Sequence, residues 1–173
     1  MKKFLVIILF LTNILFLSSC KKGVRGVIFD DIHKKADVRM EQIYNAIKNR
    51  DKDSLKATFS MQALADANDF GGSLDALFDY IQGDIQSWEQ TGTYGGTDER
   101  NVDGTGNRKK EIQSIYILTT NEQEYEIAIY VITIDTANTD NEGIYSICII
   151  NKNDKQEPEV SYWGNGEVGI NIG

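Results

Sequence analysis

The sequence is poor in the residues that most often carry catalysis or bind metals. It contains one histidine, two cysteines and one proline. A serine–histidine–acid triad would need His33, which lies beside Lys34 and Lys35 in a charged segment typical of an exposed residue. The chain has no phosphate-binding glycine loop followed by Lys-Ser/Thr, no His-Glu-x-x-His and no Cys-x-x-Cys. We therefore expect no cofactor and no metal, and the sequence does not define a biochemical activity.

The charge balance argues against nucleic acid as a partner. The net charge is −8, and removal of Met1–Ser19, which holds Lys2 and Lys3 and no acid, would take it to −10. A phosphate backbone would repel such a surface, and no cluster of lysine and arginine offsets it. Hydrophobic residues make up 41% of the chain and charged residues 25%, which favours one folded domain over disorder.

The N-terminus has the layout of a secretory signal. Met1-Lys2-Lys3 is positively charged, and the apolar run Phe4–Leu17 is too short to span about 30 Å of hydrocarbon. Leu17-Ser18-Ser19-Cys20 follows and resembles the lipobox of bacterial lipoproteins. The resemblance implies cleavage before Cys20 and its acylation by chains such as palmitate. Several acyl chains would hold the chain stably on the extracytoplasmic face of a bacterial membrane. The alternative is a secreted protein with a chance cysteine.

Helices are predicted in the first half of the remaining chain. Residues 20–30 form the lipidated cysteine and a tether, and residues 31–173 form a single domain. Asp30 or Asp31 is expected to cap a helix that ends near Asn49. Its apolar stripe consists of Ala36, Met40, Ile43, Tyr44 and Ile47. Shorter helices are expected after Asp53, after Ser60 and after Ser73, the last ending near Gly83.

The stretch from Arg108 to Asn151 predicts three consecutive antiparallel strands. Ile112–Thr120, Tyr125–Asp135 and Ile144–Asn151 are rich in β-branched and aromatic residues and are separated by short polar connections. Both parities of the central strand hold large apolar side chains, so both faces of the sheet should be at least partly covered. Cys148 lies among four isoleucines and is expected to be a buried, unreactive thiol.

Segments on both sides of the three strands complete the predicted structure. A strand is expected to begin within Asp84–Trp88, and Thr91–Asn107 forms either a long hairpin arm or a mobile loop. The acids of this loop, Asp98, Glu99 and Asp103, lack the spacing of a calcium-binding EF-hand loop. Val160–Trp163 is expected to form a last edge strand, followed by a glycine-rich tail, Gly164–Gly173.

Several stretches resemble an uncharacterised family of bacterial surface lipoproteins with a nuclear transport factor 2-like domain. They are Ile43–Asp51, Leu55–Ser60, Glu124–Ile127 and Asn141–Ile147. The resemblance implies an α+β fold in which N-terminal helices pack on a curved antiparallel sheet to form a cone. It brings no known substrate.

The resemblance also implies a pocket between helices and sheet, for which the candidates are Tyr80, Trp88, Tyr116 and Tyr130. The leading hypothesis is a lipid-anchored binding or interaction module for an unknown protein or small molecule, with no catalytic residue assigned. A pocket enzyme of the isomerase or dehydratase type, with Asp79 as its acid, and an envelope scaffold are the alternatives. A dimer is compatible with the sequence.

Overall fold

The computed structural model describes the backbone of residues 24–102, 104–153 and 167–173. Side chains are described from Lys34 onward within these ranges, apart from residues 93 and 94. Residues Ile32–Gly173 form one compact unit, which holds the sheet and the core. The expected signal peptide, Cys20 and the expected strand Val160–Trp163 lie outside the described residues.

Among the described residues four helices precede the sheet: α2 (Val24–Lys48), α3 (Lys52–Lys56), α4 (Met61–Asp66) and α5 (Phe70–Tyr80). The predicted stripe of α2 is confirmed, because Ala36, Met40, Ile43 and Ile47 are buried and Tyr44 is half-buried. The predicted start of α2 is wrong, since the helix begins at Val24, within the expected tether, rather than after Asp30 or Asp31. No described helix is both long enough and apolar enough to cross a membrane.

The short helices show how capping side chains divide this half of the chain. Ser60 caps α4 as predicted, with its hydroxyl accepting a hydrogen bond from the Ala63 N–H. The other two predicted caps are wrong, because Asp51 caps α3 in place of Asp53, and Asp69 caps α5 in place of Ser73. In each case an aspartate a few residues upstream accepts the orphan backbone N–H first, so the helix starts earlier.

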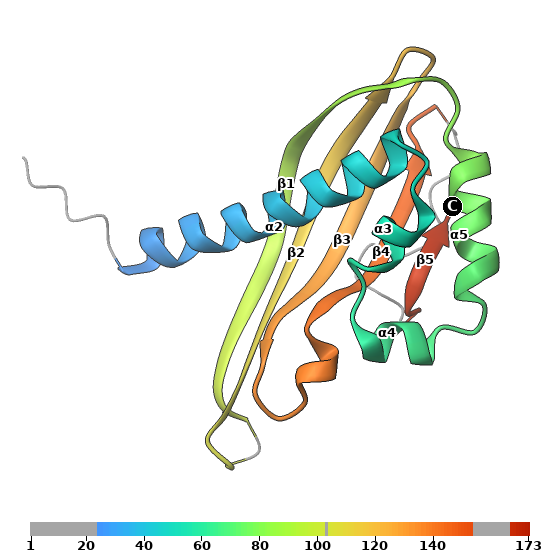
Figure 1. The fold of residues 1–173 in the computed structure, drawn as a ribbon. Coiled ribbons are helices and arrows are strands. Elements are labelled where there is room, and N and C mark those ends of the chain that lie inside the picture. The colour runs from blue at the N-terminus through green and yellow to red at the C-terminus, as the bar shows by residue number, and fades with distance from the viewer. Residues whose placement is uncertain (1–23, 103, 154–166) are drawn as a thin grey trace, which may run out of the picture. The chain divides into compact units, whose positions relative to one another are not determined.

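In the described part of the chain five strands form one curved, open sheet: β1 (Ile85–Val102), β2 (Asn107–Thr120), β3 (Glu124–Asp135), β4 (Gly143–Asn151) and β5 (Gly169–Ile172). They lie side by side in the order β1-β2-β3-β4-β5 (Figure 1). The first four are antiparallel to their neighbours, which confirms the predicted three-strand meander, and β5 is parallel to β4. The fold is therefore α+β, with the helices on one face of the sheet.

The segments before and after the predicted three-strand meander also form strands. Thr91–Asn107 is a hairpin arm rather than a loop, because β1 runs through to Val102 and pairs with β2 down to Asn107. The expected glycine-rich tail is corrected, because Gly169–Ile172 within it forms β5. Ile170 is buried against the core, and its side chain explains why this short glycine-containing segment pairs with β4.

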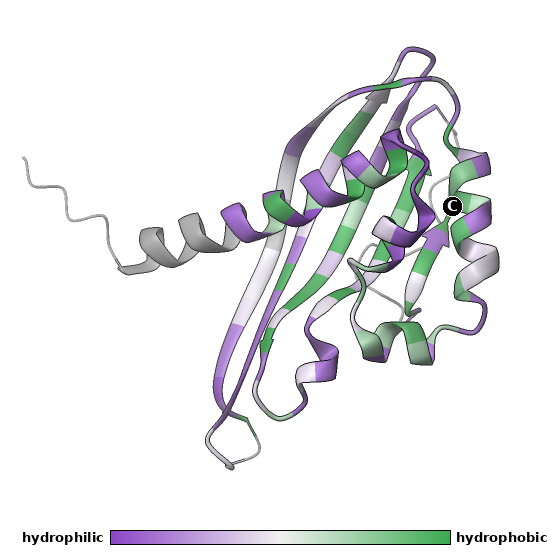
Figure 2. Cartoon of the chain, viewed as in Figure 1, coloured by the Kyte–Doolittle hydropathy of each residue, from purple (hydrophilic) through white to green (hydrophobic). Residues whose placement is uncertain are grey.

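Most of the core lies between the helices and one face of the sheet. Residues of α2, α3, α4 and α5 pack there against Tyr116 and Leu118 of β2, Ile127 and Ile129 of β3, and Ile147 of β4. Figure 2 shows hydrophobic residues concentrated on the central strands and hydrophilic residues at the far end of the β1–β2 hairpin. On the opposite parity of the strands a smaller buried cluster forms, consisting of Ile115, Ala128, Cys148 and Ile150. Both faces thus hold buried apolar residues, as predicted.

One glycine is required where the helices meet the sheet. The segment between α3 and α4 forms a parallel bridge with β4, in which the Ser60 N–H donates to the Ile144 carbonyl and the Ile144 N–H donates to the Thr58 carbonyl. Gly143 precedes this contact with φ +140°, and a Cβ there would lie 2.7 Å from the Ser60 nitrogen. A side chain is therefore excluded on both conformational and steric grounds.

Candidate functional site

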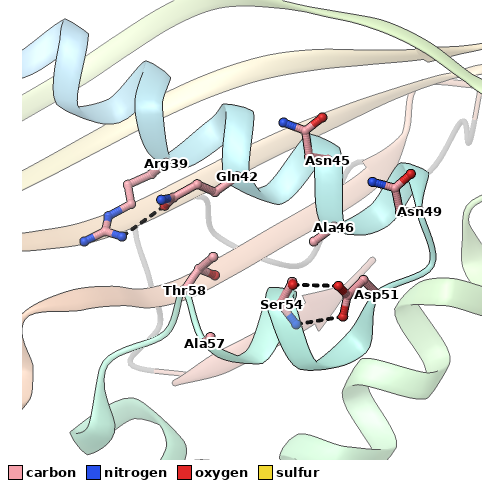
Figure 3. A pocket seen from close by; sticks show the side chains of 9 residues that line it. All are labelled: Arg39, Gln42, Asn45, Ala46, Asn49, Asp51, Ser54, Ala57 and Thr58. Atoms are coloured by element: carbon pink, nitrogen blue, oxygen red, sulfur yellow. Dashed lines mark hydrogen bonds between the residues drawn. The ribbon is translucent and has the colours of Figure 1, made fainter.

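A groove of about 380 Å³ runs between α2 and α3 (Figure 3). Such a volume lies within the range of small-molecule sites, roughly 300–1,000 Å³. The described residues that line it are Arg39, Gln42, Asn45, Ala46, Asn49, Asp51, Ser54, Ala57 and Thr58. Amide and hydroxyl side chains therefore dominate a surface that includes the buried Ala46 and Thr58. We refer to this site as the α2–α3 groove.

The tight turn between the two helices sets the geometry of the groove. At the end of α2 the Arg50 N–H donates to the Ile47 carbonyl and the Asp51 N–H donates to the Ala46 carbonyl. Arg50 adopts the left-handed conformation with φ 52°, which reverses the chain direction after only a few residues. Asp51 then starts α3 as its N-cap, so α3 returns alongside α2.

The charged groups of the groove are engaged in local contacts. One carboxylate oxygen of Asp51 accepts the Ser54 N–H at 2.9 Å and the other accepts the Ser54 hydroxyl at 2.6 Å. These hydrogen bonds, the side-chain one first, lower the pKa of Asp51 below its usual value, so the carboxylate is ionised at neutral pH. Near the other end Arg39 donates to the Gln42 amide oxygen at 3.0 Å. The lining residues therefore carry one positive and one negative charge.

This arrangement suits binding better than catalysis. Asp51 is the one carboxylate among the described lining residues, and its oxygens already serve as acceptors within α3. Its lowered pKa makes it a weak base, whereas a general base works best with a pKa near the operating pH. Gln42 and Asn49, in contrast, each carry an amide that both donates and accepts hydrogen bonds. The groove can therefore hold a polar, uncharged ligand.

Two of the four pocket residues predicted from the sequence lie together, at a second place between α2 and the sheet. The rings of Trp88 on β1 and Tyr116 on β2 make an edge contact with centroids 5.5 Å apart. The Trp88 indole N–H donates to Glu41 at 2.9 Å, and the Tyr116 hydroxyl donates to Asp37 at 3.2 Å. Both acids belong to α2, so this aromatic pair joins the helix to the two strands.

The other two predicted pocket residues lie apart from that pair and from each other. Tyr80 is the last residue of α5, and its hydroxyl accepts the Asn151 N–H and donates to the Gly173 carbonyl. Its ring makes an edge contact with Tyr125 of β3. Tyr130 makes an edge contact with Tyr145. Burial, with a hydrogen bond to Glu111, raises the pKa of Tyr130 well above its usual value. The structure thus distributes the four residues over three places.

Other residues considered from the sequence have structural surroundings. Asp79 is exposed on α5, so it does not face the predicted aromatic pocket. Asp98 accepts two hydrogen bonds of 2.7 Å from Arg108 across the β1–β2 hairpin, and Asp103 lies outside the described residues. Cys148 is buried, as predicted, and burial raises its pKa to about 11, so the thiol stays protonated at neutral pH.

Comparison with known families adds one match. A family model described as a domain of unknown function, DUF5104, matches residues 42–152. The chain belongs to the DUF5104 family. The DUF5104 region contains every described lining residue of the groove except Arg39, and it also contains the first four strands. None of the curated proteins matches the chain.

Sequence reasoning identified the aromatic pair of Trp88 and Tyr116 but missed the α2–α3 groove. The signal that could have revealed it is the row Gln42, Asn45 and Asn49, spaced by three and four residues and therefore on one face of α2. This face adjoins the apolar stripe. A polar helix face beside an apolar stripe is also what any solvated amphipathic helix shows, so the row alone does not define a site.

Proposed function

We propose that this DUF5104 protein is an extracytoplasmic lipoprotein, acylated at Cys20, whose domain is a binding module with a nuclear transport factor 2-like cone fold. Its ligand site is the α2–α3 groove, and its ligand is polar and uncharged. The observation that carries the proposal is the lining of the groove: amides and hydroxyls surround it, and its carboxylate is committed to capping α3.

The ligand class follows from the donors and acceptors. A side-chain amide has an acceptor oxygen and two N–H donors, which match the hydroxyl or amide groups of a sugar or a peptide. The Gln42 oxygen accepts from Arg39 and the Asn45 amide donates to Glu41, so the Gln42 N–H groups and the Asn49 amide are assigned to the ligand. The charges of Arg39 and Asp51 balance, so neither a strongly anionic nor a strongly cationic ligand is favoured. Ala46 and Ala57 contribute short apolar side chains, which leave room for a ring or a backbone to approach α2 and α3.

Native mass spectrometry of the full lipidated chain, purified in a mild detergent, tests the ligand proposal. We expect a neutral small molecule to co-purify with the parent and to be lost from Gln42→Ala/Asn49→Ala. The matched control is Asn68→Ala/Gln86→Ala, which removes two exposed amides outside the groove and should retain the ligand. Equal retention by both double variants would refute the groove as the binding site.

A pocket enzyme is the second candidate, and one contact favours it. Tyr116 and Asp37 form an acid–tyrosine pair beside Trp88, the kind of pair that polarises a carbonyl and moves a proton in isomerases. Here the Tyr116 ring is fully buried and its hydroxyl is held by Asp37. The binding module is the better supported of the two, because the acid–tyrosine pair already joins α2 to the sheet.

A further inference from the structure

A second pocket, of about 450 Å³, lies where the middle of α2 passes β3. Lys34, Lys35, Val38 and Arg39 form its α2 side, which we call the basic face. Ile132 and Thr133 of β3, with Glu142 before β4, form the other side. Arg39 lines both this pocket and the α2–α3 groove.

The basic face combines cations with an exposed apolar side chain. Lys34 and Val38 are four residues apart, as are Lys35 and Arg39, so each pair lies on one side of the helix. Val38 is 58% exposed, and Met61 on α4 is the other large apolar side chain with such exposure among the described residues. Lysines beside an exposed aliphatic group are typical of helices that lie at a lipid–water interface.

Glu142 does not cancel the positive charge of this face. One of its carboxylate oxygens accepts the Asp135 N–H at 2.9 Å, which directs that oxygen toward the turn after β3. Three cationic side chains therefore share the pocket with one carboxylate that already has a backbone partner. A bound anion would meet a net positive environment.

The distribution of charge along the chain also favours an anionic partner for the basic face. Residues 20–39 hold six lysines and arginines against three aspartates, a net charge of +3. Residues 40–173 hold ten basic and 23 acidic residues, a net charge of −13. The basic residues are two adjacent pairs, Lys21-Lys22 and Lys34-Lys35, and the single residues Arg25 and Arg39, so the imbalance is clearest when charges are summed over the segment. Lys34 follows the proposed acylation site, Cys20, by only 14 residues.

We infer that the basic face docks on the anionic phospholipid surface of the membrane that carries the anchor. Lys34 takes up headgroup phosphate at the pocket, Lys35 adds to the positive charge of the face, and Val38 enters the interfacial region. An anionic surface attracts basic residues close to it and repels acidic ones, so the acidic remainder of the domain is directed away from the bilayer. The orientation rests on the proposed lipid anchor, whereas the recognition of phosphate by the basic face does not.

The test uses the full chain with Val38→Cys labelled by an environment-sensitive fluorophore. It is mixed with vesicles of phosphatidylcholine alone or with about one-third phosphatidylglycerol. We expect a blue shift of the emission on the anionic vesicles only, and its loss at about 1 M salt, where the screening length falls to about 3 Å. Peptide mass spectrometry also measures the rate at which an amine-reactive reagent acylates single lysines. We expect the rate at Lys34 to fall several-fold on the anionic vesicles and the rate at the exposed Lys56 to stay unchanged.

Paired variants decide whether the basic face is responsible. Lys34→Gln/Lys35→Gln should abolish the blue shift, whereas Lys56→Gln/Arg100→Gln, which removes the same charge elsewhere, should keep it. Equal shifts for the two pairs, or equal emission on both kinds of vesicle, would overturn the inference. Flotation with the neutral vesicles reports on the anchor separately. A chain that fails to float there but shifts on anionic vesicles would refute the anchor and support the docking.

Discussion

The Tyr116 hydroxyl donates a hydrogen bond of 3.2 Å to the Asp37 carboxylate, joining β2 to α2 across 79 positions of sequence. Burial, and then the negative charge of Asp37, raises the pKa of Tyr116 far above its usual value. The hydroxyl therefore stays protonated and acts as a donor throughout the physiological range. This contact holds the long helix over the sheet, next to the Trp88–Glu41 hydrogen bond.

Replacing Tyr116 by phenylalanine should weaken this attachment without unfolding the domain. The ring is retained, while one hydrogen bond to a charged acceptor is lost, so we expect the free energy of unfolding to fall by roughly 1–3 kcal/mol. Urea denaturation measures the change. The control is Tyr44→Phe, since the Tyr44 hydroxyl, which donates to the Gln86 carbonyl, lies in an exposed contact. A larger loss from Tyr44→Phe would contradict the importance of the Tyr116–Asp37 contact.

Ile129→Asp should unfold the domain. Ile129 is 2% exposed and packs in the core on β3, where a carboxylate costs several kcal/mol against a total stability of about 5–15 kcal/mol. Asp98→Ala, at the hairpin arm, should shift the melting temperature by only a few degrees, because the Asp98–Arg108 pair is partly exposed. Circular dichroism melts compare the two variants, and a parental melting temperature for Ile129→Asp would count against the assignment of Ile129 to the core.

The sheet could be predicted from the sequence because its signal is local. Ile112–Thr120, Tyr125–Asp135 and Ile144–Asn151 each carry dense β-branched and aromatic residues, and each lies within a strand. The expected ends are confirmed, whereas β3 and β4 begin one residue earlier than expected and β2 begins five residues earlier. β5 could not be predicted this way, since Gly169–Ile172 holds only two isoleucines between polar and glycine residues. Its pairing depends on the tertiary position of Ile170 beside β4.

Gly143→Ala should destabilise the junction between helices and sheet. The new Cβ would lie 2.7 Å from the Ser60 nitrogen and 2.9 Å from its Cα, both backbone atoms that cannot rotate away. The positive φ of Gly143 adds conformational strain of about 1–2 kcal/mol for any other residue. Gly104→Ala is the matched control, because φ there is also positive but no atom lies within 4 Å. Equal melting temperatures for the two variants would exclude the steric contribution.

Asp135 should contribute stability that depends on pH. Burial alone would raise its pKa, but hydrogen bonds from the Asn141 amide and from the backbone N–H groups of Asn138 and Ala137 outweigh burial and lower the pKa. A depressed folded-state pKa stabilises the fold above the unfolded value, about 3.9, and the effect is lost as pH falls through the folded value.

The corresponding variant is Asp135→Asn. It should be less stable than the parent at pH 7, and the difference should shrink as the pH falls below the unfolded pKa of about 3.9, since only the parent loses the Asp135 charge there. Urea midpoints across this range measure it, each compared with the parent at the same pH because other carboxylates also titrate. A difference that stays constant with pH would contradict the lowered pKa.

The candidate sites were harder to predict than the fold. Tyr116 and Trp88 were identified because large aromatic side chains on strands are expected to lie in a core or a pocket. Their acidic partners, Asp37 and Glu41, were not, because a solvated helix face also carries acids and the contacts span long sequence separations. The α2–α3 groove depends on the reversal at Arg50, a left-handed residue that its sequence context does not reveal.

The intact mass of the membrane-associated protein tests the central claim, a lipid-anchored binding module, most directly. We predict a chain beginning at Cys20 and carrying diacylglyceryl and acyl groups. Cys20→Ala should leave the chain uncleaved or release it from the membrane fraction. A Cys20→Ala chain that is cleaved normally and still sediments with membranes, or a parent chain with an unmodified Cys20, would contradict the account.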